Sequence, residues 1–154
     1  MEESTRLDEV TVFGGKLSFL VPHDWEETAE ENAEENFYSY SEPGAESGWL
    51  RVSLNTVKAV RESPAEILSR IFEGRRNVTE NEQTGNWVCA YEKDSEKDGV
   101  RIHLYYWIVA KAVETDLVRE AIFSYTVLTE RANGTETRKV VGLLEQVVSR
   151  ANFT

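Results

Sequence analysis

The sequence predicts an α+β fold: a single antiparallel β-sheet of about six strands with helices on both faces. Alternating apolar and polar residues, typical of half-buried strands, recur along most of the chain. Two segments with helical periodicity are inserted at separate places, as in α+β proteins. Residues 100–112 are apolar on both faces, which predicts an interior strand covered on both sides.

Length and composition predict one domain, residues 1–154. A chain of 154 residues buries roughly two thirds of the surface that its unfolded form exposes. Hydrophobic residues make up 40 % of the chain, which is too many for a disordered protein. No linker or domain-sized repeat divides the sequence, so we expect a single core.

Residues 10–13 and 16–21 predict an opening β-hairpin. Both segments alternate, and Gly14 and Gly15 supply the positive φ angles that a two-residue type I′ or II′ turn requires. The second strand ends at Pro22, because proline cannot donate to a sheet ladder. Asp24 favours a turn directly after it.

The segment from Glu26 to Glu35 predicts a loop or one frayed helical turn. Its quasi-repeat of four residues would stack glutamates at i,i+4 in a helix, with no lysine to offset them. Each such like-charge pair costs roughly 0.2–0.5 kcal/mol. Thr28 and Glu31 are spaced as a capping box for a single turn.

Strands are predicted over 37–40 and 49–57, and a helix follows them. Ser63 is a favourable N-cap, Pro64 takes the first helical position and Glu66 the third. Gly74 ends this helix.

Three more strands and a closing helix are predicted for the second half of the chain. The strands span 87–92, 100–112 and 117–128, and a charged hairpin loop ending in Asp98-Gly99 joins the first two. Asn133-Gly134 then precedes 136–152, where apolar residues form one helical stripe.

The segment Leu17-Ser18-Phe19-Leu20-Val21-Pro22-His23-Asp24-Trp25 ends a strand in Pro-x-x-Trp. Together with the paired strands, the Ser-Pro-x-Glu helix and the terminal helix, it resembles the PsbP-like fold family. That family includes PsbP, the Ran-binding Mog protein and chaperones of type VI secretion effectors. The resemblance implies an antiparallel sheet between helices, a PsbP-like sandwich, and binding of other proteins rather than catalysis. It assigns no functional residues, and the acidic segment departs from the family pattern.

Residues that commonly carry catalysis or bind metals are sparse. His23 and His103 lie in different segments, and no second cysteine accompanies Cys89 to build a metal site. We expect His103 to be a hydrogen-bonded, half-buried residue and Cys89 to pack in the core. Phosphate-binding loops and nucleophile elbows are absent from the sequence. We therefore expect no catalytic residues, no metal, no cofactor and no enzymatic activity.

The negative charge is concentrated at one end of the chain. Residues 1–46 hold 13 Asp and Glu but only two basic residues, which accounts for the whole net charge of −11. This charge disfavours nucleic acid and anionic lipid surfaces as partners. The simplest interpretation of the glutamates is a solvated, solubilising surface, and the alternative is a docking surface. The absence of an 18-residue apolar run predicts no membrane span, and the single cysteine predicts a cytoplasmic protein.

These observations predict a non-catalytic protein-binding domain, adaptor or chaperone-like, that engages a basic or amphipathic partner segment. Aromatic residues beside charged ones are typical of binding surfaces. The predicted partner-binding residues are Trp25, Glu30, Glu31, Glu34, Glu35, Tyr38 and Tyr40. One alternative is a small-molecule-binding domain or modest enzyme with a cavity walled by Trp87, Tyr105 and Trp107. Another is an acidic, immunity-type inhibitor of a basic toxin.

Overall fold

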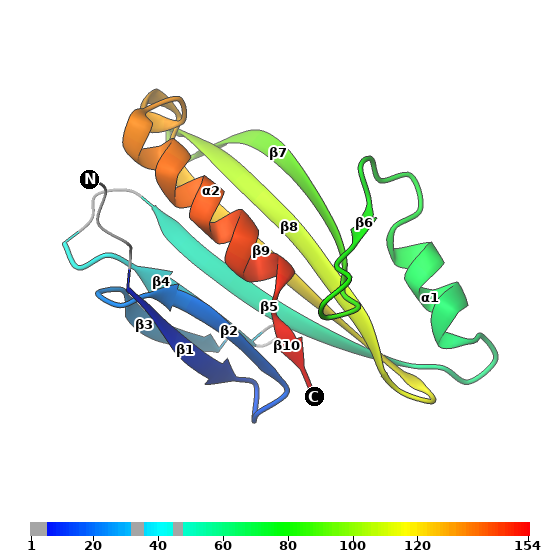
Figure 1. Ribbon diagram of the computed structural model, residues 1–154. Coiled ribbons are helices and arrows are strands. Elements are labelled where there is room, and N and C mark those ends of the chain that lie inside the picture. The colour runs from blue at the N-terminus through cyan, green and yellow to red at the C-terminus, as the bar shows by residue number, and fades with distance from the viewer. Residues whose placement is uncertain (1–5, 32–35, 45–47) are drawn as a thin grey trace.

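The computed structural model describes residues 6–31, 36–44 and 48–154, with the side chains of these residues apart from 29–31 and 36. Two α-helices and ten strands follow one another along the described chain (Figure 1). In order they are β1 (Leu7–Val12), β2 (Leu17–Pro22), β3 (Glu26–Glu31), β4 (Asn36–Ser41), β5 (Trp49–Lys58), α1 (Pro64–Ile71), β6 (Thr79–Glu80), β7 (Trp87–Lys97), β8 (Val100–Glu114), β9 (Leu117–Leu128), the 3₁₀ turn η1 (Thr129–Arg131), α2 (Thr135–Ser149) and β10 (Asn152–Phe153).

The main sheet has seven antiparallel strands in the order β3-β4-β5-β9-β8-β7-β6. The long strands β5, β9 and β8 lie side by side in its middle. The prediction of an interior strand over 100–112 is therefore confirmed, because β8 pairs with β7 on one side and β9 on the other.

A second sheet of three strands, in the order β1-β2-β10, lies apart from the main sheet. The prediction of a single sheet of about six strands is corrected accordingly, although the α+β class is confirmed. The opening hairpin does not join the main sheet, because it stacks its apolar face on that sheet through Leu17, Phe19 and Val21. The short strand β10 completes the small sheet by pairing with β2.

The two faces of the main sheet carry different cores. On one face α2 and the small sheet cover buried residues such as Trp107 and Phe123. On the other face α1 packs through Ile67 and Leu68 over Ile108 and its neighbours. Helices therefore lie on both faces, as predicted, but α1 covers only one end of its face (Figure 1).

The opening turn forms where the sequence predicts it but is longer than two residues, because Val12 and Leu17 are the last paired residues and Phe13 also has a positive φ, 54°. Gly14 and Gly15 have φ angles of 65° and 89°, and the Lys16 amide donates to the Phe13 carbonyl across the turn. In the second long hairpin, Asp98 and Gly99 also have positive φ. The charged loop that was expected before this turn is instead strand, because β7 continues to Lys97 in register with β8.

The first half of the acidic segment is a strand, which corrects the prediction of a loop or frayed turn. Glu26 to Glu31 pair with β4 in antiparallel register. A strand points successive side chains to opposite faces, so neighbouring glutamates are separated without helical i,i+4 stacking. Pairing with β4 also satisfies backbone groups that an isolated segment leaves to water.

The helix signals are confirmed at α1. The Ser63 hydroxyl accepts from the Glu66 amide, and the Glu66 carboxylate accepts from the Ser63 amide, which is a complete capping box. Gly74, with φ 75°, follows the helix end.

Candidate partner-binding groove

Helix α1 packs on one face of the main sheet but covers only one end of it, and the rest of that face has no helix above it. The eight residues of α1 span about 12 Å, whereas the fifteen residues of β8 span about 50 Å. Beyond α1 the sheet therefore ends in exposed apolar side chains. Trp49 is 38 % exposed and Val100 is 47 % exposed, both large values for apolar residues on a sheet.

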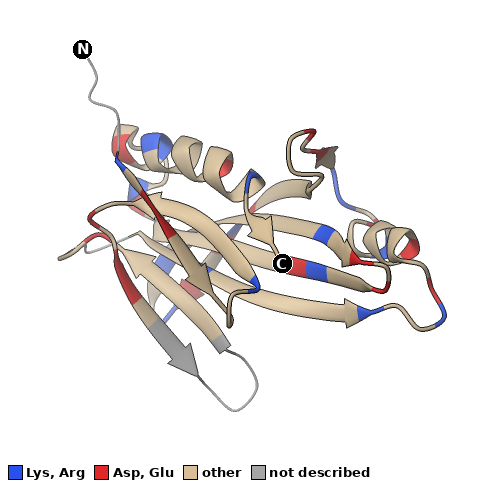
Figure 2. Ribbon diagram, turned by 60° about the horizontal axis from the view of Figure 1, so that its bottom comes forward, with Lys and Arg blue, Asp and Glu red and all other residues tan. Residues whose placement is uncertain are grey.

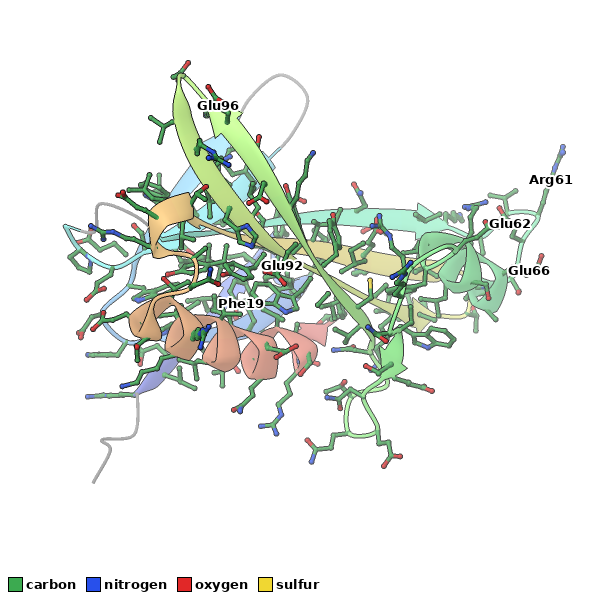
Figure 3. All side chains as sticks on the ribbon, turned by 90° about the horizontal axis from the view of Figure 1, so that it is seen from above. Phe19, Arg61, Glu62, Glu66, Glu92 and Glu96 are labelled. Carbon is green, nitrogen blue, oxygen red and sulfur yellow. The ribbon has the colours of Figure 1, made fainter. Side chains whose placement is uncertain are left out.

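These residues border a depression, the open-face groove, of about 570 Å³. The hairpin formed by β7 and β8 rises from the sheet on the side away from α2, with Glu96 near its tip (Figure 3). Strands β3 and β4 form the opposite wall, and β5 and β9 lie between the two walls. The groove is lined by Thr28, Ser39, Ser41, Trp49, Arg51, Lys97, Asp98, Val100, Ile102, Leu104, Thr126 and Leu128.

The lining combines apolar side chains with polar and charged ones. Val100, Ile102 and Leu104 come from alternate positions of β8, so they share one face of that strand. Hydroxyl groups come from strands β3, β4 and β9. The guanidinium of Arg51 lies 4.7 Å above the ring of Phe37. This mixture of apolar area and placed polar groups is typical of binding sites.

The three aromatic residues predicted for partner binding point to the other face and pack in the core. The Trp25 ring stacks on Tyr125 with centroids 6.1 Å apart. The Tyr38 ring meets Phe13 edge-on at 4.9 Å. Both side chains are half-buried, which leaves only part of each ring open to a partner.

Tyr40 is the most deeply placed of the three, with 1 % of its surface exposed. Its hydroxyl donates to Oε1 of Glu27 across the β3–β4 pair, at 2.5 Å. Burial, reinforced by this hydrogen bond to Glu27, raises the pKa of Tyr40 far above its ordinary value. The role of Tyr40 is thus to hold β3 against the core, and its side chain offers almost no surface to a partner.

Two of the four predicted acidic contacts lie on an edge strand of the main sheet. Glu30 and Glu31 belong to β3, which pairs only with β4 in the described sheet. Figure 2 shows the neighbouring acidic residues of β3 and those of β1 in red. Glu34 and Glu35 lie outside the described residues. The assignment of all four glutamates as partner contacts stays a prediction.

His103 is the centre of a polar cluster on the α2 side of the β7–β8 hairpin. Its Nδ1 lies 2.6 Å from Oδ1 of Asp94 and its Nε2 lies 2.8 Å from Oε1 of Glu92. Partial burial acts to lower the pKa of His103, but the hydrogen bonds to the two carboxylates outweigh it, and the pKa lies above its ordinary value. An imidazolium that donates from both nitrogens fits these contacts. The prediction of a hydrogen-bonded, half-buried histidine is confirmed.

The cavity predicted between Trp87, Tyr105 and Trp107 does not exist. Tyr105 and Trp107 contribute to the core under α2, whereas Trp87 packs with Phe72 beside α1 on the opposite face of the sheet. The sheet itself therefore separates Trp87 from the other two rings. Trp107 is buried, and its ring fills the core.

The remaining chemistry-bearing residues have structural surroundings. Cys89 is buried, and burial raises the pKa of its thiol, so its side chain behaves as a small apolar group, as predicted. Within the described ranges, no group of three or more His, Cys, Asp or Glu side chains is placed to hold a metal ion. No helix in those ranges has the length and apolar character needed to span a membrane.

The sequence contained a signal for the groove that the prediction did not use. The even-numbered residues from Val100 to Ala112 are apolar or aromatic throughout, whereas only one short helix was available to cover the face that they form. Comparing the length of the strand with that of the helix predicts an uncovered apolar area. Its lateral walls depend on strand order, which the residue pattern does not encode.

Comparison with known proteins relates this chain to others through its fold. No protein-family model and no curated protein sequence matches it. Among solved structures, a protein of Bacteroides thetaiotaomicron VPI-5482 aligns over 95 % of this chain and 48 % of its own, with 16 % identity and a TM-score of 0.57. This chain thus spans about half the length of that protein.

Two other structures match this chain nearly end to end. The Ran-binding protein Mog1p of Saccharomyces cerevisiae has 16 % identity and a TM-score of 0.54, with 97 % of this chain and 96 % of Mog1p covered. LpqN of Mycobacterium tuberculosis, involved in cell envelope biogenesis, has 12 % identity and a TM-score of 0.54, with 99 % and 92 % covered. The chain has a PsbP/Mog1-like fold, which confirms the resemblance carried by residues 17–25 at the level of fold.

Proposed function

We propose that this chain is a non-catalytic protein-binding domain, adaptor or chaperone-like, which receives an amphipathic segment of a partner in the open-face groove. The observation that carries the proposal is the uncovered apolar area around Trp49 and Val100. The other large apolar surfaces of the main sheet lie under α1, under α2 or under the small sheet.

An exposed apolar area of this kind favours association. Burial of apolar surface contributes roughly 25 cal/mol per Å², and contiguous apolar patches on soluble proteins commonly mark interaction sites. A partly exposed Trp among smaller apolar residues is a frequent anchor of such interfaces. Trp49 and the apolar groove residues of β8 meet this description.

The choice of a protein partner has support from the fold. Mog1p, which shares the fold over nearly its whole length, is a Ran-binding protein. Function carried between proteins of one fold is an analogy, so it adds to the argument from the groove without replacing it.

We propose strand β3, here called the acidic strand, as a second contact for a partner with basic residues. The predicted glutamates Glu30 and Glu31 lie on β3, beside the groove wall that contains Thr28. Glu34, Glu35, Trp25 and Tyr38 stay proposed contacts of the same partner. If the acidic strand alone makes the contact, the chain would act as an acidic inhibitor of a basic toxin. The single cysteine supports a cytoplasmic setting, and the chain acts as one domain in this proposal.

The mixed lining of the groove, apolar side chains with hydroxyl groups from three strands, favours one other function, the binding of a small molecule. Ligand pockets commonly measure about 300–1,000 Å³, and the open-face groove falls in this range. A thermal-shift screen of a small-molecule library tests it. A compound that stabilises the wild type but not Trp49→Ala would support ligand binding in the groove.

The protein-binding proposal is tested by paired substitutions of exposed valines. Val100→Glu places a charge in the groove, whereas Val60→Glu makes the same change at a site that is 83 % exposed outside the groove lining. Proteins captured from native lysate by the wild type should be lost with Val100→Glu and kept with Val60→Glu. Equal capture by both variants would contradict the groove as the contact.

A further inference from the structure

One row of paired residues crosses the groove, and the two residues at its ends, which are not themselves lining residues, carry opposite charges. Residues directly opposite each other on paired strands share a face of the sheet. The pairing registers link six such residues on the groove face, one from each of the adjacent strands β3, β4, β5, β9, β8 and β7. In order across the sheet they are Glu26, Ser41, Trp49, Thr126, Leu104 and Lys93.

The two sides of the groove therefore differ in charge, and the guanidinium of Arg51, which lies above the Phe37 ring, is part of the lining between them. Glu26 is an exposed carboxylate on the β3 side. Lys93 and Lys97 are exposed on the β7 side and share one face of that strand, with Asp98 in the turn beyond them. Neither lysine forms an ion pair with any residue that the structure describes. Both ammonium groups are placed to meet a carboxylate from outside the chain.

The spacing of the row fits a helix between the walls. Five inter-strand steps separate Glu26 from Lys93, about 24 Å measured along the sheet. A helix with its side chains is about 10–12 Å wide, so the two charged residues would flank it instead of lying beneath it. A single extended strand on this face would leave its backbone N–H and C=O groups unpaired against the apolar side chains of the groove. A helix pairs these groups within itself.

We infer that the occupant of the groove is an amphipathic helix whose apolar stripe is bordered by acidic residues on one side and basic residues on the other. Its acidic border lies against Lys93 and Lys97, and its basic border lies against Glu26. The inference rests on the proposed function and adds the charge pattern of the partner. A helix with two basic borders would meet repulsion at the β7 wall, although the net charge of −11 favours basic partners at long range.

The test uses the full chain and three synthetic helical peptides with the same apolar stripe. One peptide has a Lys border and a Glu border, the second has Lys on both borders, and the third has Glu on both. Binding is measured by fluorescence anisotropy of labelled peptides at low salt. We expect the wild type to bind the mixed peptide about twofold to fivefold more tightly than either uniform peptide, as exposed ion pairs predict. The difference should shrink at high salt.

Charge reversals in the protein make the test specific. Glu26→Lys makes both walls basic and should transfer the preference to the Glu peptide. The double variant Lys93→Glu/Lys97→Glu makes both walls acidic and should transfer it to the Lys peptide. The triple variant exchanges the walls and should again prefer the mixed peptide, which can bind in the reverse direction. Each variant is compared across three peptides, so a general loss of folding cannot imitate the change of order.

The outcomes separate this inference from the proposed function. If Val100→Glu removes peptide binding but the charge reversals do not change the order of affinities, the inference is overturned and the proposed function is retained. A wild type that prefers the Lys peptide also overturns it. If no peptide binds any variant, or if sedimentation shows that a second copy of the chain occupies the groove, the proposed function and the inference both fail.

Discussion

Phe19 of the small sheet meets Phe123 of the main sheet edge-on, with ring centroids 5.2 Å apart and planes at 87°. Phe19 meets Tyr40 in the same way at 5.5 Å. All three rings belong to the core that the two sheets share. Edge-to-face contacts add to the free energy of area burial, so this one residue joins the β1–β2 hairpin to two strands of the main sheet.

Replacing Phe19 with Ala should lower the free energy of unfolding by about 3–5 kcal/mol, because the buried ring leaves a cavity between the sheets. Urea denaturation monitored by Trp fluorescence measures the loss. Phe13→Ala is the matched control, since Phe13 is half-buried beside the turn and contacts Tyr38 alone among aromatic rings. A loss at Phe19 no larger than at Phe13 would contradict the role of Phe19 in joining the sheets.

Gly48→Ala should destabilise the protein more than Gly44→Ala. Both glycines have positive φ, 96° and 73°, so either alanine is strained by about 1–2 kcal/mol. Only at Gly48 would the new Cβ meet another group, the Tyr125 hydroxyl at 2.5 Å. The Tyr125 side chain is buried, so its hydroxyl has little room to move away.

Thermal unfolding of the two variants measures the difference between them. Tyr125→Phe removes the oxygen that the new Cβ meets, so it should recover part of the stability of Gly48→Ala and none of that of Gly44→Ala. Equal losses at the two glycines would show that backbone strain alone is responsible.

The His103 cluster should make stability depend on pH with a defined sign. The pKa of His103 is raised in the folded protein by Asp94 and Glu92, so the folded state favours the imidazolium. The contribution to stability is fully present below the unfolded pKa of about 6.5 and is lost as pH rises through the folded pKa.

Unfolding of the wild type and of His103→Gln between pH 5 and 9 measures this contribution. We expect the wild-type advantage to be about 0.5–1 kcal/mol at the acidic end, because both carboxylates are exposed to solvent, and to fall toward the alkaline end. Asp94→Asn should move the NMR titration midpoint of His103 downward. An advantage that grows with pH would contradict the proposed pairing.

Reversing the charge of the four predicted glutamates, Glu30, Glu31, Glu34 and Glu35, to Lys should abolish capture of a basic partner without unfolding the domain. Capture is lost because the attraction between the acidic strand and the basic partner becomes repulsion. The domain stays folded because charges on a protein surface contribute little to folding stability. The control reverses four exposed glutamates elsewhere, which gives the same net charge: Glu73, Glu80, Glu82 and Glu145. Capture retained in the first variant, or lost equally in both, would exclude the acidic strand as a specific contact.

Much of the fold could be predicted because its signals are local. The turn at Gly14 and Gly15, the capping box at Ser63 and the strand alternation of β9 each depend on neighbouring residues. Two elements were predicted wrongly for non-local reasons. Glu26 to Glu31 form a strand because β4 pairs with them. The opening hairpin forms a separate sheet, completed by β10, because its apolar face stacks on the main sheet.

The site was harder to predict than the fold. Tyr40 stands beside glutamates in the sequence, as binding-site aromatics often do, yet its side chain points into the core and its hydroxyl holds Glu27. The groove residues Trp49 and Leu104 looked like ordinary core residues. Whether an apolar strand residue is covered depends on which helix reaches it, and no residue pattern states this.

The sequence by itself determined the α+β class, the strand and helix positions marked by period and caps, and the concentration of charge near one end of the chain. Only the tertiary structure decided the strand order, the division into two sheets and the half of one face that α1 leaves open. The physical reason is that periodicity reports which face of an element is apolar. The partner that buries this face is set by long-range packing, which brings Glu26 and Lys93 to opposite ends of one row across the groove.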